Sequence, residues 1–128
     1  MKTFKISSAV YAAELDFNTI MELANAEKHY KPLPKFPATT RDIAVVVDEK
    51  INVGEIEAVI DSHKSGIIES YALFDVYRGS QLGDNKKSVA YSIVFRAADR
   101  TLTDDEVNKV MTAIIDDLKA SLNADLRL

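Results

Sequence analysis

Cysteine is absent from this 128-residue chain, and histidine occurs only twice, at His29 and His63. Without thiols the chain has no disulfide framework, no thiolate chemistry and no zinc site with sulfur ligands. One histidine lies near a proline-rich segment and the other in a predicted helix, so a metal centre would need carboxylates at no recognisable spacing. We therefore predict neither a metal site nor a cofactor site within the chain.

Long apolar runs and glycine-rich motifs are also missing. No uninterrupted apolar stretch approaches the length of a membrane span, and no secretory leader follows Met1. The phosphate-binding patterns GxxxxGK[ST] and GxGxxG do not occur, nor does the GxSxG pattern that presents an activated serine. These absences argue against a nucleotide site, an acyl-transfer nucleophile and a membrane partner, and with the lack of cysteine they favour a cytoplasmic protein.

Acidic residues outnumber basic ones and give a formal net charge of −4. This balance argues against indiscriminate nucleic-acid binding, which depends mostly on neutralising phosphates. The charges are unevenly distributed, however. Residues 78–100 hold five basic and two acidic side chains, whereas residues 101–128 hold six acidic and three basic ones. We expect a basic sheet surface and an acidic helix surface.

Proline occurs only at positions 32, 34 and 37, and this cluster predicts a linker. We place the domain boundary there, which separates residues 1–33 from a single compact domain over residues 34–128. In the first part, residues 9–17 are typical of a strand, and Asn18 is a candidate cap for a short helix that continues to Ala26.

Hydrophobic periodicity after the prolines predicts a strand, a helix, two strands, a helix and a strand. The predicted ranges are 41–48, 53–64, 67–78, 88–97, 103–119 and 124–128, with a hairpin loop over 79–87 and a capping box from Thr103 to Glu106. This order predicts the α+β class. The expected architecture is a ferredoxin-like βαββαβ sandwich, with a four-stranded antiparallel sheet and both helices on one face.

Alternation along the strands predicts which side chains the helices leave open. In the second strand, the residues expected to face the core are Ala72, Phe74 and Val76. The residues expected to point outward are Leu73, Asp75 and Tyr77. The neighbouring strands should add small side chains to the outward face, namely Ala44, Ser88 and Ala90.

An exposed carboxylate and an aromatic ring beside small residues are suited to binding guanine. The carboxylate of Asp75 can accept hydrogen bonds from the Watson–Crick edge, and the ring of Tyr77 can stack on a splayed base. The residues alone also allow a simpler interpretation, in which Asp75 is a solubilising charge and Tyr77 a half-buried sheet residue.

Basic residues around this face are candidate phosphate contacts, namely Arg78, Lys86, Lys87 and Arg96. For any single one, an ordinary solvated surface role is an equally good interpretation, so only the cluster carries weight. Arg41 has two alternatives as well, a contact with RNA at the rim of the sheet or an ion pair with a nearby acid that holds the linker.

Five blocks of the sequence resemble the ferredoxin-fold anticodon-binding domain that closes the beta subunit of bacterial phenylalanyl-tRNA synthetase. They are FP with RDIA at positions 36–44, LFDVYRG at 73–79, KSVAY at 87–91, RTLTDDEV at 100–107, and the terminal Arg127. The resemblance extends from Pro34 to Arg127, about three quarters of the chain. Residues 1–33 resemble, more weakly, the end of the synthetase-like domain that precedes this module.

The resemblance implies a tRNA-binding module without catalytic residues of its own. In that family the module contacts the anticodon stem-loop of the phenylalanine tRNA, whose first anticodon base is a guanine. The residues matching the guanine contacts are Ala44, Asp75, Tyr77 and Ser88. Complete synthetases join phenylalanine to its tRNA with ATP and magnesium, in an assembly of alpha and beta subunits, and their adenylate-forming site lies outside the segment that this chain resembles.

Two other function classes fit a ferredoxin-like sandwich, because fold does not decide function. Such domains also serve as regulatory modules that bind amino acids. A hydrolase of acylphosphatase type is a weaker alternative, since the chain has Asp48, Glu49 and Lys50 after its first predicted strand in place of a glycine-rich anion loop.

Overall fold

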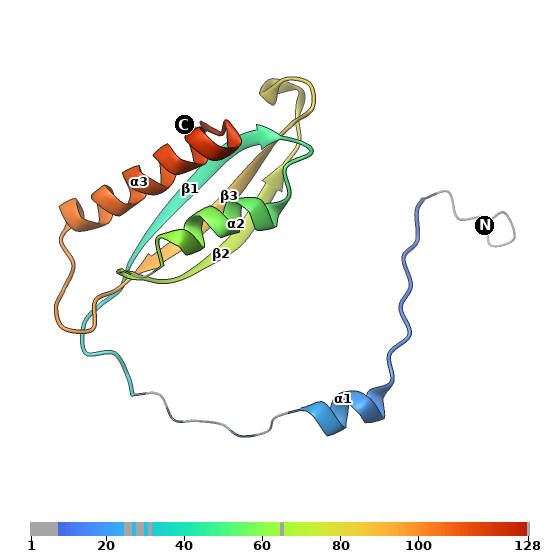
Figure 1. The fold of residues 1–128 in the computed structure, drawn as a ribbon, viewed down its shortest axis with the longest axis horizontal. Helices are drawn as coiled ribbons and strands as arrows, with labels where there is room; N and C mark the ends of the chain where they lie inside the picture. Colours follow the sequence, from blue (N-terminus) through green and yellow to red (C-terminus); the bar gives the residue numbers. More distant parts are fainter. Residues whose placement is uncertain (1–7, 25–26, 28–29, 31, 65, 128) are drawn as a thin grey trace, which may run out of the picture. The chain divides into compact units, whose positions relative to one another are not determined.

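A computed structural model describes residues 8–24, 27, 30, 32–64 and 66–127, which fall into two units, Met1–Pro32 and Leu33–Leu128. The second unit contains, in order, β1 (Thr39–Asp48), α2 (Val53–Ser62), β2 (Ile68–Tyr77), the 3-10 turn η2 (Ser80–Leu82), β3 (Lys86–Phe95), α3 (Asp104–Leu122) and β4 (Asp125–Leu126) (Figure 1). This element order confirms the predicted α+β, ferredoxin-like fold. The predicted last strand reaches Leu128, which lies outside the described residues.

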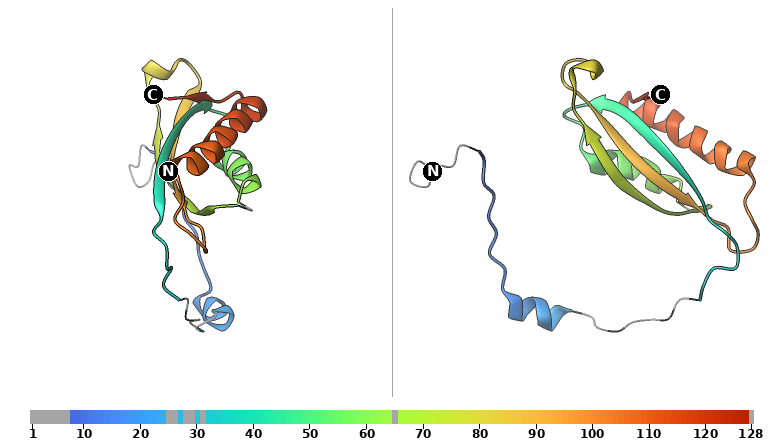
Figure 2. Two further views of the ribbon diagram at one scale, coloured as in Figure 1. Left: turned by 90° about the vertical axis from the view of Figure 1, so that its left-hand side faces the viewer. Right: turned by 180° about the vertical axis from the view of Figure 1, so that it is seen from behind.

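The four strands form one antiparallel sheet in the order β2-β3-β1-β4. β1 and β3 pair along their whole length, from Thr39 opposite Phe95 to Asp48 opposite Lys86. Figure 2 shows α2 and α3 on the same side of this sheet. The opposite face carries no helix of the unit, and it is the face on which the sequence predicts binding.

The hydrophobic core lies between the sheet and the two helices. It is built from alternate residues of the strands and from one side of each helix, as the two periodicities require. Its buried members include Ile43, Val45, Val47, Ile56, Ile60, Val89, Tyr91, Ile93, Phe95, Val107, Ile114 and Leu118. Burial raises the pKa of the Tyr91 phenol, whose hydroxyl donates to Glu57 Oε1 at 3.4 Å.

β2 departs from simple alternation at a β-bulge. Its register with β3 passes from Leu73 opposite Tyr91 to Asp75 opposite Ala90, so Phe74 is an extra residue on the bulged strand. Tyr91 belongs to the core face and Ala90 to the helix-free face. The bulge therefore sends Leu73 and Asp75 to opposite faces, although they are two residues apart.

The bulge makes three of the predicted side-chain orientations wrong. Leu73 pairs with the buried Tyr91 and so lies on the core side, although its own side chain is 39% exposed, and Ala72, which is opposite Ser92, lies on the helix-free face. Phe74 is not a core residue, because its side chain is 59% exposed. Strict alternation assigned all three incorrectly since a single inserted residue reverses the pattern on one side of it.

The hairpin loop between β2 and β3 is shorter than predicted. β3 begins at Lys86, and Lys86 and Lys87 pair with Asp48 and Val47 of β1. Because Val47 faces the core, Lys87 lies on the core side, where it is only 7% exposed. Its ammonium group donates to the carbonyl oxygen of Glu49 at 2.9 Å, which satisfies the buried charge with a hydrogen bond.

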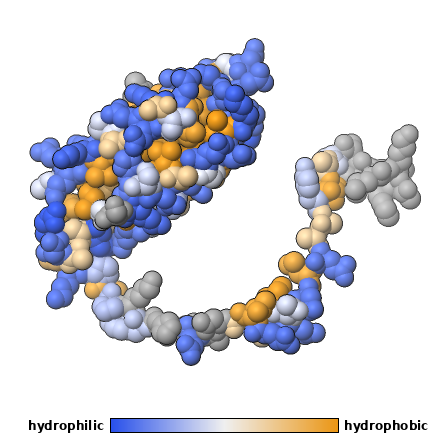
Figure 3. All heavy atoms as spheres, viewed as in Figure 1, coloured by the Kyte–Doolittle hydropathy of each residue, from blue (hydrophilic) through white to orange (hydrophobic). Residues whose placement is uncertain are grey.

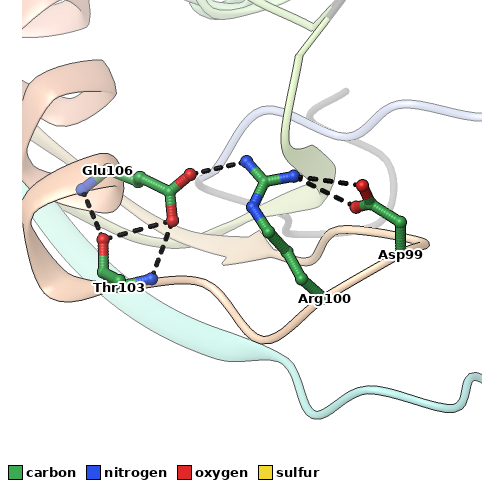
Figure 4. Close-up of polar contacts among 4 residues, drawn as sticks. All are labelled: Asp99, Arg100, Thr103 and Glu106. Atoms are coloured by element: carbon green, nitrogen blue, oxygen red, sulfur yellow. Dashed lines mark hydrogen bonds and ion pairs between the residues drawn. The ribbon is translucent and has the colours of Figure 1, made fainter.

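The predicted capping box at the start of α3 is confirmed. The Thr103 amide donates to Glu106 Oε2 at 2.9 Å, and the Glu106 amide donates to Thr103 Oγ1 at 3.3 Å. Figure 4 shows Arg100 on the other side of the same carboxylate, which it contacts at 2.5 Å, while it also contacts Asp99. The Thr103 backbone and the Arg100 guanidinium together lower the pKa of Glu106 to about 2.

Acid should weaken the fold through Glu106. Since its pKa in the folded protein is about 2, below the ordinary value of 4.5, its stabilising effect is complete above pH 4.5 and is lost as pH falls toward 2. We expect Glu106→Gln to flatten the dependence of unfolding free energy on pH in this window, measured by urea denaturation at several pH values. Asp105→Asn, at an exposed acid of the same helical turn, is the control. An equal flattening in both variants would contradict the assignment.

The described residues of the first unit contain one short helix, α1 (Phe17–Leu23). Asp16 caps it, because its carboxylate accepts from the Asn18 and Thr19 amides. The predicted cap at Asn18 is therefore two residues late, and the predicted end at Ala26 lies outside the described residues. The predicted strand over 9–17 is wrong: described residues 8–16 form no strand, as expected where no neighbouring strand pairs with the backbone.

Large apolar side chains of the first unit are exposed. They include Tyr11, Leu15, Phe17, Met21 and Leu23, and Figure 3 shows apolar atoms along this segment. Burying such side chains is favourable, so these exposed residues make the segment a candidate contact surface. None of the helices in the described part of the chain is long and apolar enough to cross a membrane.

Candidate nucleic-acid interface

Strand pairing brings five of the predicted site residues together on the helix-free face of the sheet. Asp75, Ala90 and Ala44 form one row across β2, β3 and β1. Tyr77 and Ser88 lie in the next row. Directly opposite residues of paired strands point to the same face. We call these residues the open-face site: Ala44, Asp75, Tyr77, Ser88 and Ala90.

Asp75 supplies an available acceptor within the open-face site. Its side chain is exposed, and no described residue donates a hydrogen bond to it or forms an ion pair with it. Ala90 and Ala44 follow it across the sheet, so the side chains beside the carboxylate are methyl groups. Neighbouring strands are about 4.8 Å apart, so this row is about 10 Å long. The carboxylate therefore lies at one end of a short apolar row on the surface of the sheet.

Tyr77 supplies the aromatic ring, and two other residues fix its position. A side chain at Gly79 would overlap the Tyr77 ring and hydroxyl, so glycine is needed there for the ring to occupy its observed place. The guanidinium carbon of Arg127 lies 4.8 Å from the ring centroid, within the range of a cation–π interaction. The ring is therefore held between Gly79, two residues after β2, and a cation from the C-terminal segment.

The sequence did not predict Arg127 as a site residue. Its amide donates to the carbonyl of Ala44 at 2.9 Å, which continues the pairing of β4 with β1 by one residue. Asp125 lies opposite Val46 on the helix-free face, and Arg127, two residues further along, lies on the same face. Because β4 has only two residues, alternation in the sequence cannot predict the face on which Arg127 lies. Its pairing with β1 decides the face.

Three of the predicted phosphate contacts lie at the same end of the sheet, but each already has a partner. Arg78 donates from Nε and Nη2 to the carboxylate of Glu49 at 2.9–3.2 Å, and this hydrogen bonding lowers the pKa of Glu49. Lys86 Nζ lies 3.5 Å from Asp125 Oδ2. Lys87 is buried, as described above, so the structure gives its ammonium group an internal role.

Arg96 and Arg41 lie away from the open-face site. Arg96 is eight residues beyond Ser88, about 27 Å along the strand direction. It contacts Glu69 at 3.0 Å and the Phe36 carbonyl at 2.5 Å. Arg41 forms an ion pair with Asp104 at 2.6 Å. Of the two alternatives for Arg41, the structure supports the ion pair, which joins β1 to the first residue of α3.

Residues 34–127 match the family model described as the ferredoxin-fold anticodon binding domain. The chain belongs to this family. The match covers the whole sandwich described above, including every residue of the open-face site, and it confirms the resemblance seen in the sequence.

Related proteins match this chain over most of its length. The phenylalanine–tRNA ligase beta subunit of Clostridium tetani is 48% identical over 127 residues, which is 99% of this chain and 16% of that protein. The beta subunit of Clostridium acetobutylicum is 44% identical over 98% of the chain. That of Corynebacterium glutamicum is 44% identical over 91%. The chain spans only 14–16% of the length of these relatives.

The open-face site of this anticodon binding domain offers groups for recognition. It contains an exposed carboxylate acceptor at Asp75, a buried serine hydroxyl at Ser88 and a tyrosine ring beside small apolar residues, and these are the kinds of group by which proteins bind unstacked bases. Among the described residues, no cluster of three or more aspartate, glutamate or histidine side chains could hold a metal ion.

Proposed function

We propose that this domain binds the anticodon stem-loop of the phenylalanine tRNA, as the C-terminal module of a phenylalanyl-tRNA synthetase beta subunit. The observation that carries the proposal is the open-face site, five residues assembled from three strands on a helix-free surface, in a chain that belongs to an anticodon binding family. In this proposal Asp75 accepts hydrogen bonds from the guanine at the first anticodon position, and Tyr77 stacks on that base.

The basic residues divide into two groups in this proposal. Lys86 and Arg78 lie beside the open-face site and can exchange their surface ion pairs for phosphates at small cost, because exposed pairs contribute little. Lys87 holds the backbone of Glu49 from inside the sandwich, and Arg96 holds Phe36 at the far end. We therefore assign phosphate contacts to Lys86 and Arg78 only.

The complete protein is proposed to be a ligase that attaches phenylalanine to its tRNA in the cytoplasm, with an alpha subunit as partner. ATP and magnesium would act at a site elsewhere in that assembly. The present chain would supply tRNA recognition. Residues 1–33 would belong to the preceding synthetase-like domain, whose surface would cover the apolar side chains that α1 and its flanking segment leave exposed.

Binding of an anticodon arm tests this function. We expect the isolated chain to bind the anticodon arm of the phenylalanine tRNA weakly, with an affinity that falls as salt rises, because one small module makes few phosphate contacts. Lys86→Ala should weaken cognate and non-cognate arms alike and reduce the salt slope by about one. Fluorescence anisotropy at several salt concentrations measures both quantities.

Lys119→Ala is the matched control, since Lys119 lies in the last turn of α3 in the helix layer. It should leave the affinity unchanged. If Lys86→Ala alters only the preference between bases, its assignment to a phosphate is wrong. If the arm does not bind while calorimetry detects phenylalanine, the domain is instead an amino-acid-binding module.

A further inference from the structure

Two residues of the open-face site are buried on the face of the sheet opposite α2 and α3. Ser88 is 2% exposed and Ala90 is 7% exposed, although both side chains point away from the helix layer. Exposed strands normally leave alternate side chains accessible to water on such a face. Ser88 lies between Tyr77 of β2 and Val46 of β1, so side chains of the neighbouring strands shield it from water.

Two side chains of the C-terminal segment extend across this face of the sheet. Arg127 starts opposite Ala44 in β1 and extends over the alanine row until its guanidinium carbon is 4.8 Å from the centroid of the Tyr77 ring, on the strand at the opposite edge of the sheet. Asp125, two residues earlier, reaches over β1 to Lys86 of β3 at 3.5 Å. Two cross-sheet contacts thus begin within three residues of one short strand.

The Arg127 contact and a stacked base cannot occupy the same side of the ring. Carbon atoms in contact are about 3.5–4.0 Å apart, so a base inserted between ring and guanidinium would separate them by about 7 Å. The observed 4.8 Å is too short for this. Because an exposed cation–π contact is weaker than stacking of a base on an aromatic ring, a base can displace the guanidinium.

We propose that Arg127 is a further residue of the RNA site, where it occupies on Tyr77 the place that a nucleobase takes in the complex. In the free domain its guanidinium covers one face of the ring. RNA binding moves the side chain away and opens the centre of the site. This inference rests on the proposed function, because it requires a base to stack on Tyr77.

A double-mutant cycle isolates this competition. Arg127→Ala removes a positive charge, which should weaken RNA binding equally whether or not Tyr77 is present, and it also removes the competitor, which matters only when Tyr77 is present. The quantity to compare is the factor by which Arg127→Ala changes the affinity for the arm, measured once with Tyr77 present and once in the Tyr77→Ala protein. We expect this factor to be about 2- to 5-fold more favourable with Tyr77 present, which corresponds to the free energy of an exposed cation–π contact. A ratio of one or below overturns the proposal.

Nuclear magnetic resonance observes the stack directly. In the free wild-type protein the Tyr77 ring current should shift the Arg127 δ-methylene protons upfield, and Tyr77→Ala should abolish the shift. Saturation with the anticodon arm should abolish it as well. If the arm binds and the shift persists, RNA does not displace Arg127 from Tyr77, and this inference is wrong while the proposed function stands. If the shift is present and no arm binds at saturating concentration, the proposed function fails and this inference fails with it.

Discussion

Asp75→Asn in the intact synthetase should reduce the discrimination of guanine from adenine at the first anticodon position by about 1–3 kcal/mol. The change keeps the size of the side chain but turns one acceptor oxygen into a donor, which cannot accept from the Watson–Crick edge of guanine. Folding should be barely affected, because no described residue pairs with this carboxylate. The ratio of kcat/KM for transcripts that differ only at this base measures the effect.

Asp84→Asn is the matched control for Asp75→Asn. It makes the same change of charge at an exposed acid in the hairpin loop, outside the open-face site, and should leave discrimination unaltered. Unchanged discrimination in the Asp75→Asn enzyme would remove Asp75 from the site. Tyr77→Ala should instead weaken the binding of every base at this position by a comparable amount, because stacking needs only a π-face.

Phe95→Ala should destabilise the domain by about 3–5 kcal/mol. The Phe95 ring is completely buried in the core at the end of β3, so its removal loses the transfer free energy of the ring and leaves a cavity. Domains of this size are stable by only about 5–15 kcal/mol, so the change removes a large share. Urea denaturation followed by circular dichroism measures the free energy of unfolding.

Phe74→Ala is the control for Phe95→Ala, because it removes the same ring from an exposed position on the β2 bulge. We expect it to cost less than about 1 kcal/mol. The comparison also tests the bulge itself. Without it, alternation places Phe74 in the core beside Val76, and the two variants would then be destabilised to a similar extent.

Pattern alone predicted the face on which most residues of the open-face site lie, because that face depends on short-range geometry. Ala44, Ser88 and Ala90 lie on regular strands, where alternation fixes the face, and a capping box needs only three residues of helix to form. Alternation placed Asp75 and Tyr77 on the correct face because both follow the bulge, where the regular pattern holds. Residues on the other side of the bulge, Ala72 and Leu73, were placed on the wrong one.

The sequence by itself determined the fold class, the order of the elements and the residue types of the open-face site, because hydrophobic periodicity and capping are local properties of the chain. Only the tertiary structure decided where the register shifts in β2, that Lys87 is an internal residue, and that Arg127 covers Tyr77. Each of these depends on which strands lie side by side. A bulge, a buried lysine and a cation over a ring exist only through pairing between residues that are distant in the chain.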